Sequence, residues 1–364
     1  MTRSLDVFLH AVGPTGVSRN AVAICERMAA AGWDVRLLCC RVAEGFGAPG
    51  GAWLRVLPDW GLPRAVGLAR ALPVLRAELR ARRPDVFLSA GNHAHITAYG
   101  ASKGLGLRTA FRISNDVDHG VPLVRGATSR LLAGAGDLLI LVSGALAESP
   151  VFAGLMDEGR AQVIRNGVDL ARVRAAAPCP HPWLLEGQPP VIVTLARYAP
   201  QKNLGALIGA MARVRARVPA RLIVLGGGPE AARAKLAARA AGLGIADAVH
   251  FGGAVANPFA WLSRADAFAL PSLYEGASNA LLEALACGVP VVASETAGDA
   301  PYVLGKGRYG LLHDPRDEGA LADAILRQLG GTRVLPGDRA EAFSLAATMD
   351  AYEAALTALA ERGR

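Results

Sequence analysis

The chain has 364 residues, which corresponds to about two domains at roughly 100–200 residues per domain. Hydrophobic residues make up 52% and charged residues 19%, a balance that excludes intrinsic disorder and is ordinary for a globular enzyme. The 39 basic against 31 acidic residues leave a net charge of +8, which favours anionic partners such as nucleotides or phospholipid surfaces.

From the N-terminus onward, short runs of β-branched and aliphatic residues alternate with longer segments of helical period, the pattern typical of parallel α/β sheets. In the first half the predicted strands are 5–10, 34–39, 53–58, 85–90, 108–114, 138–143 and 162–165, and the helices are 17–31, 63–82 and 121–134. In the second half the predicted strands are 191–196, 221–227, 248–253, 267–271, 291–294 and 310–313, and the helices are 204–218 and 338–361.

A proline-rich break divides this series, because the segment 179–190 holds four prolines and one glycine. We predict a Rossmann-like first domain over 1–170, a linker over 171–190 and a Rossmann-like second domain over 191–337. The C-terminal helix over 338–364 can pack back towards the first domain. Two doubly wound domains joined in this way are expected to face a central cleft, since such sheets bind ligands at the carboxyl ends of their strands.

The cysteines and the N-terminus point to a reducing compartment. The five cysteines are odd in number and show no C-x-x-C spacing, so we expect reduced thiols and neither a disulfide framework nor a zinc site. The first apolar run is interrupted at Asp6 and His10, unlike a signal peptide. Nowhere do about 18 uncharged apolar residues follow one another. We predict a cytoplasmic protein, with peripheral contact to the inner face of the membrane as an open alternative.

The segment 64–83 carries the strongest local charge, six arginines against Glu78. Arg76, Arg80 and Arg83 share one face of the predicted helix. This face is either solvated, with arginine stems covering a packed helix, or a docking surface for anionic lipid. The solvated face is the more common outcome of such a run. Aromatic residues are only 5% and are not interleaved with basic ones, so we expect no nucleic-acid partner.

The most informative stretch is 270–294, LPSLYEGASNALLEALACGVPVVAS. A strand ends, a loop carries Glu275, and a helix opens near Ser278 with Glu283 two turns below the loop. The backbone N–H groups of 277–280 at the helix start form a ready phosphate site. Two glutamates at this spacing also recur by chance, in which case they are only a loop charge and a helix charge.

The stretch resembles the Glu-x(7)-Glu signature of glycosyltransferase family 4 and its GT-B relatives. Further segments resemble the family's motifs in the same order: GPTGVSRNAVAICERMAAAGWDV (13–35), LILVSG (139–144), VIRNGVD (163–169), VTLARYAPQKNLGALIGAM (193–211), RLIVLGGGPE (221–230) and VHFGG (249–253). The resemblance covers nearly the full chain, and independent motifs agree with one another. It implies the GT-B fold, with the acceptor in the first domain and a nucleotide sugar in the second.

The resemblance also implies roles for individual residues. Arg197 and Lys202 match the family's phosphate-binding cations, and Glu275 is expected to orient sugar hydroxyls near developing positive charge. Glu283 is expected to hold the ribose, and Gly16 lets backbone approach the diphosphate closely. The loop and the start of the helix that opens near Ser278 are expected to supply the remaining donor contacts: Gly276, Ala277, Ser278, Asn279 and Ala280. Here the Ala-Ser pair replaces the Phe-Pro pair that the family often has, which changes the contacts to the sugar.

On the acceptor side this sequence departs from the family. Many members have a histidine after the strand that is predicted here at 108–114, whereas this chain has Ser-Asn-Asp followed by a later histidine. The candidates are Asn115, Asp116 and His119. Whether Asp116 or His119 contacts the acceptor stays open, and His119 is equally consistent with a loop residue that has no role.

Two further motifs carry less weight. GGGPEA at 226–231, with Asp247 about twenty residues later, fits a dinucleotide fingerprint, but that fingerprint belongs in the first turn of its domain. A tight turn is the better interpretation. Asp116 and Asp118 form a D-x-D motif that, with His119, offers ligands for Mn²⁺ or Mg²⁺. The GT-B architecture does not require a metal, so we predict no metal and no cofactor.

The resemblance implies a retaining transfer of sugar from a nucleoside diphosphate sugar, with UDP favoured, to a carbohydrate or lipid-linked acceptor. The setting would be synthesis of cell-surface polysaccharide, lipopolysaccharide or glycolipid. Two alternatives stay open, an epimerase acting on the nucleotide sugar and a non-catalytic nucleotide-sugar-binding subunit. Intact Arg197, Lys202, Glu275 and Glu283 favour an active enzyme.

Overall fold

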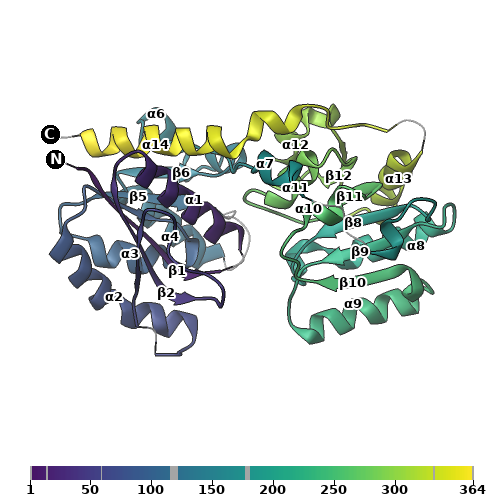
Figure 1. Ribbon diagram of the computed structural model, residues 1–364, viewed down its shortest axis with the longest axis horizontal. Coiled ribbons are helices and arrows are strands. Elements are labelled where there is room, and N and C mark those ends of the chain that lie inside the picture. Colours follow the sequence, from purple (N-terminus) through teal and green to yellow (C-terminus); the bar gives the residue numbers. More distant parts are fainter. Residues whose placement is uncertain are drawn as a thin grey trace. The chain divides into compact units, whose positions relative to one another are not determined.

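The computed structural model describes residues 2–13, 15–58, 60–114, 122–176, 181–330 and 333–362. The chain divides into unit 1, which comprises Met1–Asn166 and Ala346–Arg364, and unit 2, which comprises Gly167–Leu345. It therefore passes from unit 1 into unit 2 once and returns once, and the C-terminal helix belongs to unit 1 (Figure 1).

Unit 1 is built on a parallel sheet of seven strands in the order β3-β2-β1-β4-β5-β6-β7. The strands are β1 (Ser4–Val12), β2 (Asp34–Val42), β3 (Trp53–Val56), β4 (Val86–Ser89), β5 (Arg108–Ile113), β6 (Leu138–Leu141) and β7 (Ala161–Val163). The helices are α1 (Gly16–Ala30), α2 (Arg64–Arg82), α3 (His95–Ser102), α4 (Pro122–Ala135), α5 (Gly144–Ala147), α6 (Ala153–Asp157) and α14 (Leu345–Glu361). Strands β4 and β6 are buried at every position, as parallel strands covered on both faces must be.

The C-terminal helix α14 is tied to the sheet of unit 1 by a buried arginine. Arg112, in β5, is 1% exposed. Its Nε donates to the Tyr352 hydroxyl of α14 at 3.0 Å, and its Nη2 donates to Asn166 Oδ1 at 2.6 Å. Within the described residues no carboxylate pairs with this guanidinium, so neutral oxygens alone hold the buried charge. The arginine thereby links β5, α14 and the end of the first segment of unit 1.

His95, at the start of α3, is a second buried polar group in unit 1 and is 2% exposed. Its Nδ1 lies 2.7 Å from Ser89 Oγ, and its Nε2 lies 3.2 Å from the Arg112 carbonyl oxygen. These partners suit a neutral ring that accepts from the serine hydroxyl and donates to the carbonyl. Burial lowers the pKa of His95 to about 3, although the hydrogen bond to the carbonyl opposes the shift.

Unit 1 should therefore lose stability in acid through His95. In the unfolded chain the pKa returns to about 6.5, so the unfolded state binds the extra proton first as the pH falls. The contribution is complete above about pH 6.5 and is lost between there and about pH 3, at up to about 1.4 kcal/mol per pH unit. Urea unfolding at a series of pH values measures this slope. His95→Gln should flatten it, and parallel curves for the two proteins would contradict the assignment.

Unit 2 is built on a parallel sheet of six strands in the order β10-β9-β8-β11-β12-β13. The strands are β8 (Val191–Leu195), β9 (Arg221–Leu225), β10 (Val249–Gly253), β11 (Ala267–Leu270), β12 (Val291–Ser294) and β13 (Leu311–His313). The helices are α7 (Leu170–Arg174), α8 (Leu204–Arg215), α9 (Glu230–Gly242), α10 (Phe259–Leu262), α11 (Asn279–Ala286), α12 (Ala300–Val303) and α13 (Glu318–Leu329).

Successive residues of its strands pack on opposite faces of the sheet. Val191 and Val193 of β8 belong to one core cluster together with Leu281 of α11. Ile192, between them, belongs to the other cluster, together with Leu207 of α8 and residues of α13. Helix α11 therefore covers one face, and α8 and α13 cover the other.

The predicted fold class is confirmed, since each predicted strand is present with its ends shifted by at most three residues. The unit boundaries differ from the predicted domains. Residues 167–170 belong to unit 2, and so does the described part of the predicted linker 171–190, where Leu184 joins the core. The predicted helix 338–364 is interrupted at Ser344, because a 3-10 turn ends there in unit 2 before α14 begins.

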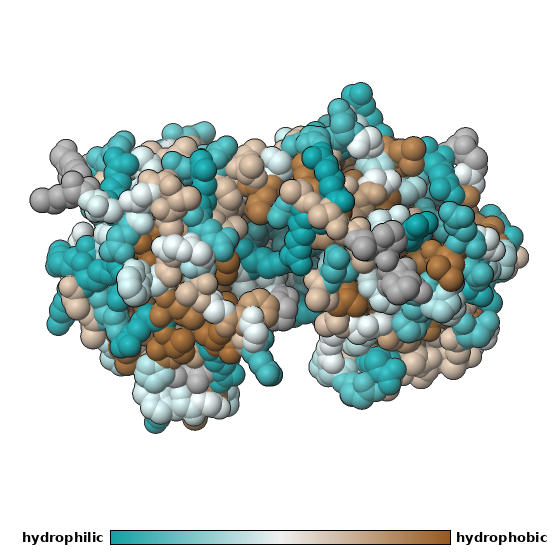
Figure 2. All heavy atoms as spheres, viewed as in Figure 1, coloured by the Kyte–Doolittle hydropathy of each residue, from teal (hydrophilic) through white to brown (hydrophobic). Residues whose placement is uncertain are grey.

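Two arginines of the segment 64–83, Arg76 in α2 and the C-cap residue Arg83, form hydrogen bonds inside unit 1. Arg76 Nη1 donates to the carbonyl oxygens of Ala101 and Lys103 at 3.0 and 2.7 Å, and Arg83 Nη2 donates to that of Leu105 at 3.0 Å. Figure 2 shows hydrophilic residues spread over both units. Within the described ranges, no helix has the length and apolar character needed to cross a bilayer. Contact with an anionic membrane stays a prediction.

Candidate functional site

The carboxyl edge of the unit 2 sheet contains a point where the winding of the chain reverses. From β8 the chain continues to β9 on one side, and from β11 it continues to β12 on the other, while β8 and β11 are neighbours. The loops that follow β8 and β11 therefore diverge, which is where open α/β sheets bind their ligands. Of the residues predicted to bind the donor or to act in catalysis, all except Gly16 lie in these two loops or on α11.

The loop after β8 carries both predicted cations. Arg197 is exposed, and its guanidinium has no hydrogen-bond or ion-pair partner in the part of the chain that the structure describes. Lys202 is the last residue of a 3-10 turn. The next residue, Asn203, has a φ of 52°, and its side-chain amide donates to the Pro315 carbonyl at 2.8 Å. Asparagine tolerates this left-handed conformation better than most residues. The turn and the hydrogen bond of Asn203 therefore fix the backbone next to Lys202.

Lys202 and Glu275 form an ion pair between the two loops, from Nζ to Oε1. Ser272 Oγ donates to the same carboxylate oxygen at 2.8 Å. Gln201 adds two more bonds: its carbonyl accepts from Leu273 N at 2.9 Å, and its side-chain amide donates to the carbonyl of the residue before Glu275 at 3.2 Å. The two loops are therefore joined into one arrangement.

The ion pair is largely withdrawn from solvent, with side-chain exposures of 14% for Lys202 and 7% for Glu275. Because the two charges offset each other, Arg197 supplies the net positive charge of the joined loops. A guanidinium binds phosphate oxygens in pairs, and a carboxylate accepts hydrogen bonds from hydroxyl groups. The arrangement suits a ligand in which an anionic group adjoins hydroxyl groups.

Helix α11 starts directly after the loop of Glu275. Ser278 is its N-cap residue, and its Oγ accepts a hydrogen bond from Leu281 N at 3.4 Å. Glu283 is on the buried side of the helix and is 7% exposed. The backbone predicted to bind the donor runs through the N-cap into the first turn: Gly276, Ala277, Ser278, Asn279 and Ala280. The N–H groups of a first helical turn have no acceptor within the helix, so this stretch offers donors to phosphate or sugar oxygens.

Two glycines allow close backbone approach around the site. Gly298, after β12, has a φ of 57°, and a Cβ there would lie 2.7 Å from the Gly276 carbonyl oxygen. Gly226 has a φ of 138°, and a Cβ there would lie 2.1 Å from the Ala196 carbonyl oxygen. Chain packing therefore explains the first glycine of the 226–231 motif, which agrees with the tight-turn interpretation.

Three residues of this arrangement escaped the sequence analysis. Gln201 and Ser272 contribute hydrogen bonds that join or orient the two loops, and Asn203 ends the cation-bearing loop. The available signal was weak, since each is only a small polar residue within three positions of Lys202 or Glu275. Such residues in loops are also common without any role.

The other predicted site residues lie in unit 1 or outside the residues that the structure describes. Gly16 is the first residue of α1, directly after the N-cap Thr15 and near the carboxyl end of β1. Asn115, Asp116 and His119 lie outside the described residues, so the acceptor-side and metal-binding interpretations of that segment stay predictions. Among the side chains described, no group of three His, Cys, Asp or Glu residues could hold a metal ion.

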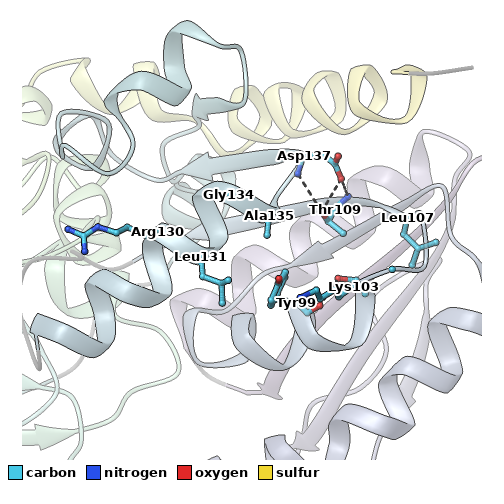
Figure 3. A pocket seen from close by; sticks show the side chains of 12 residues that line it. Tyr99, Lys103, Leu107, Thr109, Arg130, Leu131, Gly134, Ala135 and Asp137 are labelled. Carbon is cyan, nitrogen blue, oxygen red and sulfur yellow. Dashed lines mark hydrogen bonds between the residues drawn. The ribbon is translucent and has the colours of Figure 1, made fainter.

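Unit 1 also contains a pocket of about 560 Å³ between the C-terminal parts of α3 and α4. It lies at the amino ends of β5 and β6, whereas α/β sheets bind ligands at the carboxyl ends. The Asp137 carboxylate is already engaged, because it accepts from the Thr109 amide at 2.7 Å and hydroxyl at 3.0 Å (Figure 3). Arg130 points away from the other labelled side chains. We therefore place the candidate site in unit 2.

Comparison with known proteins matches both units to sugar-transferring families. The model described as Glycosyltransferase Family 4 matches residues 14–172, and the model described as Glycosyl transferases group 1 matches residues 189–330. The GDP-mannose-dependent alpha-(1-6)-phosphatidylinositol monomannoside mannosyltransferase of Mycobacterium tuberculosis is 36% identical over 153 residues, which are 39% of this chain and 39% of that protein. The chain thus spans less than two thirds of the length of the curated relatives that it matches, 39% in this mannosyltransferase and 57% in the alpha-maltose-1-phosphate synthase of Mycolicibacterium smegmatis.

Two solved structures show the likeness of the fold. Sucrose-phosphate synthase from Thermosynechococcus elongatus superposes with a TM-score of 0.85 at 19% identity, covering 98% of this chain and 99% of that chain. HepE from Anabaena in complex with UDP and glucose superposes with a TM-score of 0.80 at 18% identity, covering 97% and 99%. The shared architecture is GT-B, two Rossmann-like domains in one chain.

Proposed function

Since the chain belongs to glycosyltransferase family 4, we propose that it transfers a sugar from a nucleoside diphosphate sugar to a carbohydrate or lipid-linked acceptor with retention of anomeric configuration. The observation that carries this proposal is that Arg197, which has no hydrogen-bond or ion-pair partner among the described residues, shares its loop with the Lys202 that pairs with Glu275, where the loops after β8 and β11 diverge. A cation for the diphosphate and a carboxylate for the sugar meet there.

In the proposed reaction the bond between the anomeric carbon and the diphosphate oxygen breaks as the acceptor oxygen bonds to that carbon from the same face. The acceptor proton passes to a diphosphate oxygen. Arg197, Lys202 and the N–H groups at the start of α11 would offset the charge that grows on the leaving diphosphate. Glu275 would orient sugar hydroxyls near the positive charge that develops on the sugar ring, and Glu283 would hold the ribose.

The base of the nucleotide and the acceptor belong to the same proposal. The sequence favours UDP, HepE was solved with UDP and glucose, and the name of the mycobacterial relative specifies GDP-mannose. That name also specifies a lipid-linked acceptor, which supports the lipid-linked class. We propose a role in synthesis of cell-surface polysaccharide, lipopolysaccharide or glycolipid.

A thermal-shift screen against UDP-, GDP- and ADP-sugars tests the donor. A sugar nucleotide present at about 100 times its dissociation constant should stabilise the folded protein by about 2.7 kcal/mol. Product analysis by NMR with a carbohydrate acceptor then separates transfer from epimerisation and reports the anomeric configuration. If none of the three nucleotides shifts the transition, the donor site is misplaced; binding without any product would identify a non-catalytic subunit.

Turnover should persist without divalent metal. In the proposed reaction the charge on the leaving diphosphate is offset by side chains and backbone N–H groups, so initial rates in 10-fold excess EDTA should stay within about twofold of those in Mg²⁺. Complete loss of activity in EDTA, restored by Mn²⁺, would contradict this and direct attention to Asp116 and Asp118.

A further inference from the structure

We propose that Ser272 is a positioning residue that orients the carboxylate of Glu275 for the donor sugar, an inference that rests on the proposed function. Ser272 follows β11 and is fully buried. Its hydroxyl donates to Glu275 Oε1 at 2.8 Å. A buried hydroxyl without a partner is costly, so this hydrogen bond is strongly favoured once the loop folds.

The hydrogen bond makes the two oxygens of Glu275 inequivalent. Oε1 accepts from both Ser272 and Lys202. Oε2 accepts no hydrogen bond from any described residue. One oxygen is thus committed to the protein, and the other is the one that a substrate hydroxyl can use. The terminal torsion of a glutamate is soft, so a carboxylate needs such a second fixed partner to hold one orientation.

Lys202 alone would not hold this orientation. An ammonium group is a compact charge on a flexible stem, so it can bind a carboxylate oxygen over a range of carboxylate torsion angles. The serine hydroxyl comes from the loop of Glu275 itself, three residues earlier, and its hydrogen bond to the oxygen that faces Lys202 restricts this torsion angle. A reacting group displaced by about 1 Å can lose about 10²-fold in rate, so the orientation bears on catalysis more than on binding.

The loop offers a matched control. Thr296 Oγ1 donates to the Leu273 carbonyl at 2.7 Å and lies 3.0 Å from Ser294 Oγ, so it holds the same loop through a hydroxyl but makes no hydrogen bond with Glu275. Thr296→Val removes this hydroxyl with little change in shape. If hydroxyls merely stabilise the loop, Ser272→Ala and Thr296→Val should have similar effects.

The experiment measures kcat and the donor KM of the full chain for the wild type, four single variants and one double variant. Ser272→Ala should lower kcat about 10- to 100-fold, as loss of a hydrogen bond to a charged group does, while the donor KM stays within about threefold. Thr296→Val should stay within about threefold in both. Ser272→Cys, which keeps the shape with a weaker donor, should fall between wild type and Ser272→Ala. Ser272→Cys also provides the test of this hydrogen bond if Ser272→Ala folds poorly.

A double-mutant cycle identifies the group through which Ser272 acts. In a Glu275→Ala background, the further change Ser272→Ala should cost less than about twofold in kcat, because no carboxylate is left to orient. A wild type that binds no nucleotide sugar and makes no product would overturn the proposed function and this inference together. Transfer by the wild type with Ser272→Ala equal to Thr296→Val, or an undiminished loss in the Glu275→Ala background, would overturn this inference alone.

Discussion

Arg197→Ala will lower kcat for sugar transfer about 10²–10³-fold with near-native folding, the loss expected when one electrostatic donor to a developing anion is removed. The charge on the departing diphosphate grows towards the transition state, so the rate should suffer more than donor binding. Steady-state kinetics with a radiolabelled donor measure this. The Arg197 guanidinium makes no hydrogen bond or ion pair with any described residue, so its removal breaks no such interaction there.

Lys202→Ala should lower kcat about as much as Arg197→Ala does, for two reasons. It removes a cation from the leaving group, and it leaves the largely buried Glu275 without its counter-ion. The double mutant should lose less than the product of the two single losses if the cations act as a unit. Arg217→Ala, a change at an arginine whose side chain is 70% exposed, is the control for loss of a surface charge and should change kcat by less than about twofold. Near-wild-type turnover in both single mutants would sink the assignment.

A chain that stops after Leu345 should fail to fold unit 1, although most residues of unit 1 come from the N-terminal segment Met1–Asn166. The missing helix carries buried Met349, Tyr352, Leu356 and Leu359. Each such side chain contributes about 2–5 kcal/mol, so their sum is comparable with the total stability of about 5–15 kcal/mol that a domain has. Loss of the Tyr352 hydroxyl also removes a partner of the buried Arg112.

Calorimetry and limited proteolysis measure this result. The shortened chain should show one unfolding transition and yield a resistant fragment near 167–345, whereas a chain that ends at Arg362 should behave as the full chain does. Resistance of residues 2–166 to protease in the shortened chain would show that α14 is dispensable for unit 1.

The sequence predicts local structure well because buried parallel strands are continuous apolar runs. Strand β12 is an example, since every one of its residues is buried and its predicted bounds are those observed. The start of α11 was equally predictable, because Ser278 has the side chain that an N-cap requires. In both cases the information lies within a few neighbouring residues.

What the sequence could not predict depends on contacts between distant residues. Helical period identifies α14 but not the sheet that it covers, because its partner Arg112 is 240 residues away. Lys202 and Glu275 are 73 residues apart, and only the strand order makes their loops adjacent. The family resemblance suggested a role for each of them separately. That the two side chains pair with each other, with Ser272 on the same oxygen, follows from the structure.

The two ends of unit 2 are hydrogen-bonded to each other, since Leu345 N donates to the Val168 carbonyl at 2.9 Å and Val168 N donates to the Phe343 carbonyl at 2.9 Å. Unit 2 is thus an insertion whose entry and exit lie side by side, the arrangement in which a whole domain can be exchanged with little disturbance of its host. Recombination between related genes at the codons for 167 and 345 would replace unit 2 as a whole and leave both pieces of unit 1 in place. On the proposed function, this architecture lets a lineage change the sugar that is transferred while it keeps the molecule that receives it.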